Sequence, residues 1–410
     1  MAWLTSAAHT RWLESETDRL LGFARASAVP GGFGWLDDAG TVDAARHLPL
    51  WVTCRMTHVF ALGTLLGRPG CGPLVDHGVR ALTETFRDAE HGGWFSVVGP
   101  DGPVDDGKAA YPHSFVVLAA SSAAAAGRPG ARELLTEALA VQAKHFWDDD
   151  AGMVTESWDR AFTEQEEYRG VNANMHTVEA YLAAADVTGD DVWLNRALRI
   201  TERVVHAFAR DNDWRIPEHF DPRWEAQLDY NLEEPAHAFR PYGATIGHWL
   251  EWSRLTLHVR SAITQRGRAA PEWLLPDASA LFDAAVREGW SVDGAPGFVY
   301  TVDWQGRPVV RERMNWVVCE GIAAAAALYS ITFDPSYDGW YRLWWDHAAE
   351  SFCDLDGGSW WHELGPDLEV SRGTWSGKPD VYHTVQATLI PRLPLTPALA
   401  PALARGMLDA

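Results

Sequence analysis

NANMHTVEAYLAAADVTG, at residues 172–189, is the stretch that decides the fold. Small and apolar residues fill most of its positions and charged residues are few, which is typical of a helix buried on most of its faces. Five further segments share this character, and they lie at 50–63, 111–127, 242–255, 314–330 and 381–393. The same helical unit therefore recurs six times along the chain.

Short turns rich in glycine and aromatic residues separate these units. They lie at 31–40, 92–102, 151–160, 211–221, 294–306 and 357–367, and their Gly and Asp residues favour short β-hairpins. More charged, amphipathic segments follow the buried ones, as at 73–89, 131–146 and 191–210. We therefore expect each buried helix to have an amphipathic partner on the outside.

Each unit is a helical hairpin of roughly 60–70 residues, too small to bury its own apolar face, so neighbouring units must pack together. Six such hairpins predict an all-α (α/α)6 barrel, with six inner and six outer helices and with the β-hairpins at one rim of a central cavity. No linker rich in Pro, Gly or Ser divides the chain, which predicts a single catalytic domain over residues 1–410. The Ala- and Pro-rich segment 394–410 is expected to be a loose C-terminal tail.

One position of the inner helices is rich in histidine. In the six aligned segments it holds Arg55, His113, His176, His248, Val317 and His383, and the position three residues later holds His58, Val116, Glu179, Glu251, Glu320 and Gln386. Residues i and i+3 share one face of a helix, so a ring of inner helices would direct these side chains at the cavity. Burying so many imidazoles is costly unless they bind something. The pattern predicts a functional site; the alternative is a polar layer that only sets helix packing.

Paired histidines suit proton transfer. Imidazole titrates near neutral pH, so it both takes and gives a proton. Glu251, one helical turn beyond His248, is expected to hold that ring's other N–H. Two opposed histidines fit a reaction that removes a proton from carbon and returns it nearby. They fit glycoside hydrolysis poorly, because that reaction usually needs two carboxylates flanking the bond.

A zinc site is the main competing interpretation, since three histidines and a glutamate could bind this ion. However, the His-x-x-Glu spacing differs from the HExxH pattern of zinc proteases. The cations Arg55, Lys378 and Arg240 would also repel a metal ion if they share the cavity. The sequence therefore favours a site without a metal or another cofactor.

The composition limits the partners. The chain has 410 residues and a net charge of −22, which disfavours nucleic acid and anionic membrane surfaces. It shows no signal-peptide pattern, no apolar run of about 20 residues and no CxxC pair among its four cysteines, which together predict a cytoplasmic protein. The 22 tryptophans raise the expectation of a carbohydrate site, because indole rings stack on sugars.

Several of these segments carry a resemblance to a known family. LWVTCRMTHVFALG at 50–63, VNANMHTVEAYLAA at 171–184, RPYGATIGHWLEWSRL at 240–255 and GKPDVYHTVQATLIPRLP at 377–394 match in order and spacing. The chain resembles the N-acylglucosamine 2-epimerase superfamily over nearly its whole length, and within it the branch of D-mannose and sulfoquinovose isomerases. The resemblance implies an (α/α)6 barrel and metal-independent proton transfer through a cis-enediol.

The resemblance also implies roles for particular residues. His383 and His248 would be the acid–base pair, with Glu251 orienting or assisting His248. The residues expected to hold or surround the sugar are Arg55, His176, Asn172, Trp51, Tyr111, Trp316 and Arg240, and the histidine-rich positions add His113 and Glu320.

The expected activity is therefore the interconversion of D-mannose and D-fructose, or of D-lyxose and D-xylulose. A sugar 2-epimerase acting on a mono- or disaccharide, or a sulfoquinovose isomerase, would use the same groups. An (α/α)6 glycosidase would need a pair of acids near the rim, and Asp105, Asp106, Glu218 and Asp221 lie there but are expected to be solvated. A sugar-binding protein without catalysis would explain the tryptophans but not the histidines. The sequence leaves open whether the chain is a monomer or a homodimer.

Overall fold

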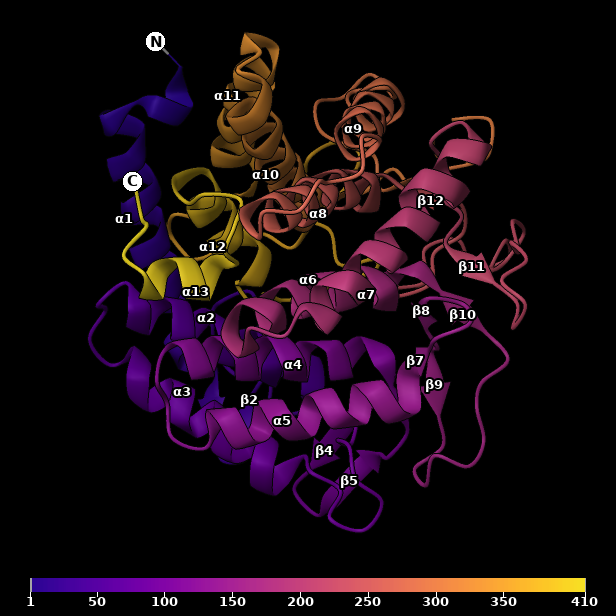
Figure 1. Cartoon of the computed structure of the whole chain (residues 1–410). Coiled ribbons are helices and arrows are strands. Elements are labelled where there is room, and N and C mark those ends of the chain that lie inside the picture. Colours follow the sequence, from indigo (N-terminus) through magenta and orange to yellow (C-terminus); the bar gives the residue numbers. More distant parts are fainter. Residues whose placement is uncertain (1, 410) are drawn as a thin grey trace.

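Inner and outer helices alternate along the chain, as the sequence predicts. The computed structural model describes residues 2–409. Neighbouring inner helices contact one another in sequence order, and the last contacts the first, so the ring closes. The inner helices are α2 (Leu50–Leu65), α4 (Ala110–Ala125), α6 (Val171–Thr188), α8 (Ile246–Gln265), α10 (Asn315–Thr332) and α12 (Tyr382–Leu389). The outer helices are α1 (Ala7–Ala24), α3 (Cys71–Arg80), α5 (Ala131–Val141), α7 (Asp191–Thr201), α9 (Leu274–Gly289) and α11 (Pro335–His347). The expected (α/α)6 barrel is confirmed (Figure 1).

The two rings of helices differ in how they are buried. In α4 the side chains from Pro112 to Ala124 are all buried, because this helix has neighbours on every side. The outer helix α3 buries only one face, which includes Val75 and Val79, and leaves the other face to solvent. Outer helices α3, α5, α7 and α11 continue into π-helical turns at Ala81–Thr85, Gln142–Phe146, Glu202–Ala209 and Ala348–Phe352. The pattern of apolar residues therefore distinguishes inner helices, which are apolar on most faces, from outer helices, which are apolar on one face.

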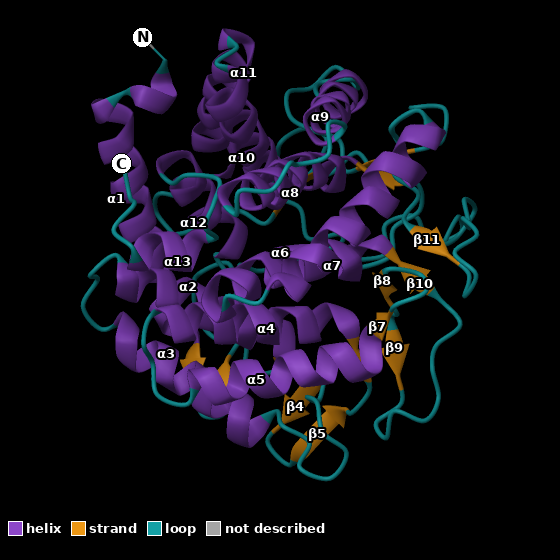
Figure 2. Ribbon diagram, in the orientation of Figure 1, coloured by secondary structure: helices purple, strands orange, loops and turns teal. Residues whose placement is uncertain are grey.

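Short antiparallel strands gather at one end of the barrel (Figure 2). Three pairs are local hairpins: β1 (Ala28–Val29) with β2 (Gly32–Phe33), β4 (Val97–Gly99) with β5 (Gly102–Asp105), and β7 (Trp147–Asp148) with β8 (Met153–Val154). Five others join the residues before an inner helix to the turn after its outer partner: β3 (Leu48–Pro49) with β4, β6 (Lys108–Ala109) with β9 (Ser157–Trp158), β10 (Arg169–Gly170) with β11 (His219–Phe220), β12 (Ala244–Thr245) with β13 (Thr301–Val302), and β14 (Arg313–Met314) with β15 (Glu363–Leu364). Each of these five pairs closes one helical hairpin and fixes where its inner helix begins.

The C-terminal segment is packed, so the prediction of a loose tail over 394–410 is wrong for the described residues. Helix α13 (Leu399–Ala404) buries Ala402 and Leu403 against the barrel end opposite the strands. The backbone N–H of Ala398 donates to Asp186 Oδ2 at 2.8 Å, which ties the segment to α6. A six-residue helix has too few turns to show amphipathic periodicity, so the pattern of apolar residues does not predict it.

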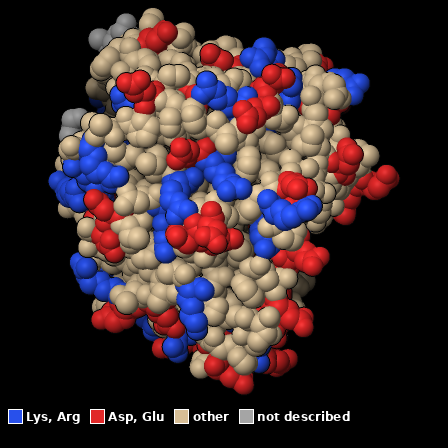
Figure 3. Space-filling view, turned by 45° about the vertical axis from the view of Figure 1, so that its right-hand side comes forward, with Lys and Arg blue, Asp and Glu red and all other residues tan. Residues whose placement is uncertain are grey.

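Charged residues of both signs lie on the surface, and the most apolar long helix lies inside the barrel. Lysine and arginine lie among aspartate and glutamate on the face drawn in Figure 3, rather than forming a continuous basic surface. Helix α10 is long and apolar enough to span a membrane, yet 78% of it is buried inside the barrel as an inner helix. All four cysteines are free thiols.

Candidate active site

A cavity opens at the strand end of the barrel. Its walls come from the first turns of the inner helices, from the loop between β11 and β12, and from segments next to β13 and β15. Nine of the twelve predicted site residues line it: Trp51, Arg55, Tyr111, Asn172, His176, His248, Glu251, Trp316 and His383. The sequence did not single out Ala238, Phe239, Pro241, Tyr300, His362 and Trp375, which line it as well.

His383, at the start of α12, is held by a carboxylate on α10. Its Nδ1 lies 2.9 Å from Glu320 Oε1, and a carboxylate only accepts, so Nδ1–H donates and Nε2 keeps its lone pair. Glu320 Oε2 accepts from Arg254 Nε at 2.9 Å. Burial lowers the pKa of His383, an effect that Glu320 partly offsets. This imidazole is therefore prepared to accept a proton through Nε2.

His248, at the start of α8, has an equivalent anchor, but it is not the one predicted. Its Nδ1 lies 2.9 Å from Glu218 Oε2, and Glu218 is only 4% exposed. The expectation that Glu251 holds this ring is wrong, and so is the expectation that Glu218 is a solvated rim acid. Pairing of β10 with β11 places Glu218 beside the entrance of α8, and no local spacing in the sequence reveals such a non-local pairing.

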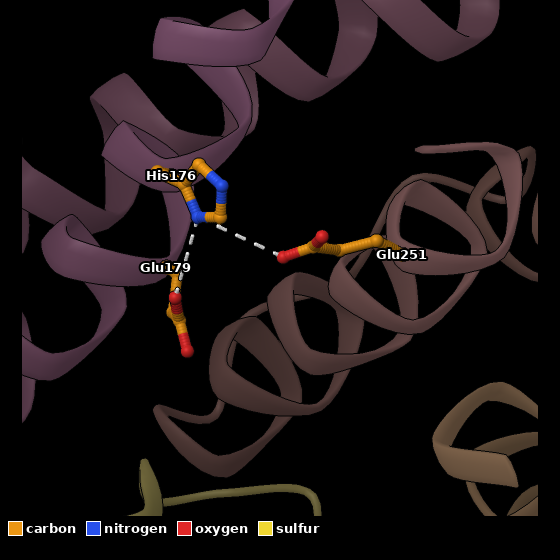
Figure 4. A group of neighbouring side chains, drawn as sticks. All are labelled: His176, Glu179 and Glu251. Atoms are coloured by element: carbon orange, nitrogen blue, oxygen red, sulfur yellow. Dashed lines mark ion pairs between the residues drawn. The ribbon is translucent and has the colours of Figure 1, made fainter. Parts of the chain in front are cut away.

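Glu251 instead faces His176 across the floor of the cavity (Figure 4). His176 Nδ1 lies 3.8 Å from Glu251 Oε1 and 3.8 Å from Glu179 Oε2. Burial, together with the charge of nearby Glu320, raises the pKa of Glu251 well above its ordinary value. Glu179 is held by Gln386 Nε2 at 2.8 Å and by the Tyr382 hydroxyl. His176 thus lies between two carboxyl groups from different helices, of which Glu251 lines the cavity and Glu179 lies behind it.

Arg55 supplies the cavity with a fixed positive charge. Its guanidinium donates to the Tyr111 hydroxyl at 3.0 Å and to Asp380 Oδ2 at 3.3 Å, and lies 4.9 Å from the centre of the Trp51 ring. Burial disfavours the charge, but Tyr111, Asp380 and Tyr382 together keep the pKa of Arg55 above its ordinary value. A permanently charged, immobilised donor of this kind is suited to an oxygen that becomes negative during a reaction.

Aromatic rings form much of the remaining wall. The Trp316 ring lies 5.4 Å from the His248 ring and 5.7 Å from the His383 ring, between centroids, so one indole contacts both histidines. Phe239 and Trp375 pack edge to face at 5.2 Å near the mouth. Tryptophan content drew attention to such rings in general, but Phe239 lies in an irregular loop that no periodicity identifies.

Three predicted site residues lie outside the cavity. His113 donates through Nδ1 to Ala109 O at 2.7 Å and accepts from the Trp94 backbone N–H at 3.2 Å, so it is a structural residue, and burial lowers its pKa to about 3. In α4 it is Tyr111, two residues earlier, that reaches the cavity. Glu320 lies behind His383 and does not line the cavity.

Arg240, the third of these residues, lies in a wider groove outside the cavity. Its guanidinium makes a bidentate pair with Glu166, at 2.7 and 3.0 Å. Lys378, which the sequence placed among the cations that could share the cavity, is buried elsewhere and paired with Asp354. Among the described residues that line the cavity, Arg55 is therefore the only lysine or arginine.

Comparisons with known proteins match this chain to one family and to D-mannose isomerases. The profile of the N-acylglucosamine 2-epimerase (GlcNAc 2-epimerase) family matches residues 31–387. The chain is 55% identical over 405 residues to a D-mannose isomerase from Thermobifida fusca, covering 98% of each chain. It is 51% identical over 403 residues to a D-mannose isomerase from Pseudomonas cannabina pv. alisalensis, covering 98% of this chain and 97% of the relative. A crystal structure of a D-mannose isomerase superposes with a TM-score of 0.86 at 27% identity, covering 94% and 97% of the two chains.

Proposed function

Because the chain belongs to the N-acylglucosamine 2-epimerase family, we propose that it is an aldose–ketose isomerase that interconverts D-mannose and D-fructose. The two relatives that share more than half of its residues carry the name D-mannose isomerase. D-Lyxose, which has the same configuration at carbons 2 and 3, is a second candidate substrate. The compartment we propose is the cytoplasm, in keeping with four free thiols.

The observation that carries the proposal is the pair of carboxylate-anchored histidines. His248 and His383 each donate Nδ1–H to a buried glutamate, which fixes the tautomer and leaves Nε2 to exchange a proton with the substrate. A hydrogen that moves between neighbouring carbons needs such groups at both ends of its path. Both rings border one cavity and contact the same indole.

The proposed reaction starts from the open-chain aldose. His383 removes the proton from carbon 2, and Arg55 stabilises the negative oxygen of the resulting cis-enediolate. His248 carries a proton between the two oxygens, and carbon 1 then receives the hydrogen, which gives the ketose. Return of the proton to the opposite face of carbon 2 would give the 2-epimer instead. Imidazoles and a guanidinium supply both the proton transfer and the charge stabilisation, so we propose a reaction that needs no metal.

Charge in the cavity favours a neutral sugar over a sulfonated one. A sulfonate carries a full negative charge and needs a cation that no acid already neutralises, but Arg55 is paired with Asp380 and Arg240 with Glu166. The glycosidase alternative needs two carboxylates facing the substrate. Among the described residues that line the cavity, Glu251 is the only carboxylic acid.

Proton NMR of D-mannose with EDTA-treated protein in heavy water tests the proposal. We expect fructose to form, with deuterium at carbon 1 to the extent that the enediol exchanges with solvent. Deuterated glucose without fructose would replace the proposal with a 2-epimerase. An inactive metal-free protein that regains activity with added divalent cations would contradict the metal-independent mechanism.

A further inference from the structure

His176, Glu179 and Glu251 form a group that the proposed reaction does not fully use. We infer that these three residues bind one divalent cation of the zinc class, and that the bound cation inhibits the enzyme by occupying the floor of the sugar cavity. The inference goes beyond the proposed function, because the cation is an inhibitor and not a cofactor. It can also be tested by binding alone, without any sugar.

Two buried polar atoms in this group have no hydrogen-bond partner. They are His176 Nδ1 and Glu251 Oε2, on side chains that are 4% and 0% exposed. A buried polar atom without a partner is costly, and a bound cation would satisfy both atoms at once. Figure 4 shows the imidazole of α6 pointing between the two carboxyl groups, one on its own helix and one on α8.

The spacing of the ligand atoms fits a small ion. One nitrogen or oxygen from each of the three residues lies within 4.8 Å of the others, and Nδ1 of His176 is 3.8 Å from a carboxylate oxygen on each side. Those 3.8 Å contacts are too long for hydrogen bonds. They are close to the separation of about 3.4 Å between two tetrahedral ligands that are each about 2.1 Å from zinc. Movement of these side chains toward a common centre would complete three-ligand coordination.

A neighbouring group, Glu251 with Glu320 and His383, has similar spacing, but both oxygens of Glu320 are already hydrogen-bonded. Nδ1 of His383 donates to Glu320 Oε1, and the other oxygen of Glu320 accepts from Arg254. A cation there would have to displace a proton and an arginine. Arg254 also lies 3.4 Å from Glu251 Oε1, but its closest pairing is with Glu320, and Oε2 of Glu251 has no partner.

The ligand set selects the type of cation. One imidazole and two carboxylates suit Zn²⁺ or Co²⁺, which accept nitrogen ligands and low coordination numbers. Mg²⁺ and Ca²⁺ prefer six or more oxygen ligands, which this group does not provide. Because His176 and Glu251 both line the sugar cavity, the cation and the sugar should compete.

Calorimetric titration of EDTA-treated, dialysed protein with ZnCl₂ is the test. We expect one site, no heat from MgCl₂, and Zn²⁺ inhibition that raises the KM for mannose, leaves kcat unchanged and is reversed by EDTA. His176→Asn should weaken Zn²⁺ binding by about tenfold or more, since even changes in residues behind metal ligands cost about 10–100-fold in affinity. Glu320→Gln, the matched control in the neighbouring group, should retain it.

Several results would overturn the inference: no Zn²⁺ binding, equal binding by His176→Asn, or loss of binding in Glu320→Gln but not in His176→Asn. If circular dichroism shows that His176→Asn is unfolded, Glu179→Gln replaces it, with the same expected loss. Co²⁺ should give the d–d absorption of a low-coordinate site in the wild-type protein. If the protein is inactive with mannose, the proposed function fails, while calorimetry still decides the cation site.

Discussion

The two histidine–carboxylate pairs of this barrel are alike in geometry and different in surroundings. Glu320 lies on an inner helix and divides its negative charge between His383 and Arg254, whereas Glu218 precedes a strand at the rim and holds His248 without an arginine. Burial lowers the pKa of His383, so this ring stays neutral and ready to accept a proton. The difference favours His383 as the group that takes the proton from carbon and His248 as the group that carries a proton between oxygens.

Replacing either histidine should have the largest effect on activity. His383→Gln and His248→Gln should each lower kcat by about 10²–10⁴-fold, the usual contribution of general acid–base catalysis. Steady-state kinetics with D-mannose measures the loss. The control is His113→Asn, which removes a buried histidine outside the cavity: melting temperature should fall while kcat stays within about threefold of wild type. If a variant of His248 or His383 kept most of the activity, the replaced histidine would not be one of the two acid–base groups.

Substitutions of the two glutamates that hold the histidines should differ in their effect on stability. Glu218→Gln and Glu320→Gln should both lower kcat by about 10–100-fold, because each histidine loses its charged partner. Only Glu320→Gln leaves a buried arginine undercompensated, which should cost about 3 kcal/mol of unfolding free energy. Urea unfolding followed by circular dichroism gives that number. Equal stability losses in the two variants would show that the surroundings of the pairs do not differ in the way described.

Arg55→Lys should have a smaller effect. Lysine keeps the charge but cannot reach Tyr111 and Asp380 with one planar group, so the developing oxygen charge is less well placed. We expect kcat to fall by about tenfold, with a smaller change in KM. A change confined to KM would make Arg55 a residue that binds ground-state sugar, and its role in stabilising the enediolate would be withdrawn.

Substitutions at the barrel end opposite the strands, where α13 packs, should have the smallest effect on catalysis. Leu403→Ala removes a buried side chain of α13 and should lower the free energy of unfolding by about 2–3 kcal/mol. Because α13 lies opposite the cavity, kcat and KM at 25 °C should match those of the wild type. A large loss of kcat at full folding would reveal coupling between the two ends of the barrel.

Sequence reasoning succeeded where helical periodicity decides the outcome. His176, His248 and His383 occupy equivalent turns of inner helices, so a six-fold repeat is enough to bring them together. It failed where strands or irregular segments do the positioning. Glu218 reaches His248 through the pairing of β10 with β11, and Phe239 enters the cavity on a loop. The prediction that His113 belongs to the site was wrong for a third reason. Helix α4 presents Tyr111 to the cavity instead, so the six inner helices are not in one common rotational register.

In the proposed reaction, His383 removes the hydrogen from carbon 2. The most direct test follows the loss of deuterium from carbon 2 of D-[2-²H]mannose by NMR, in EDTA-treated wild-type protein and in His383→Gln. We expect the wild type to move deuterium to carbon 1 or to solvent at a rate close to turnover, and His383→Gln to be slower by about 10³-fold. If the deuterium left carbon 2 in His383→Gln within tenfold of the wild-type rate, another group would be the base, and the proposed roles of the two histidines would be wrong.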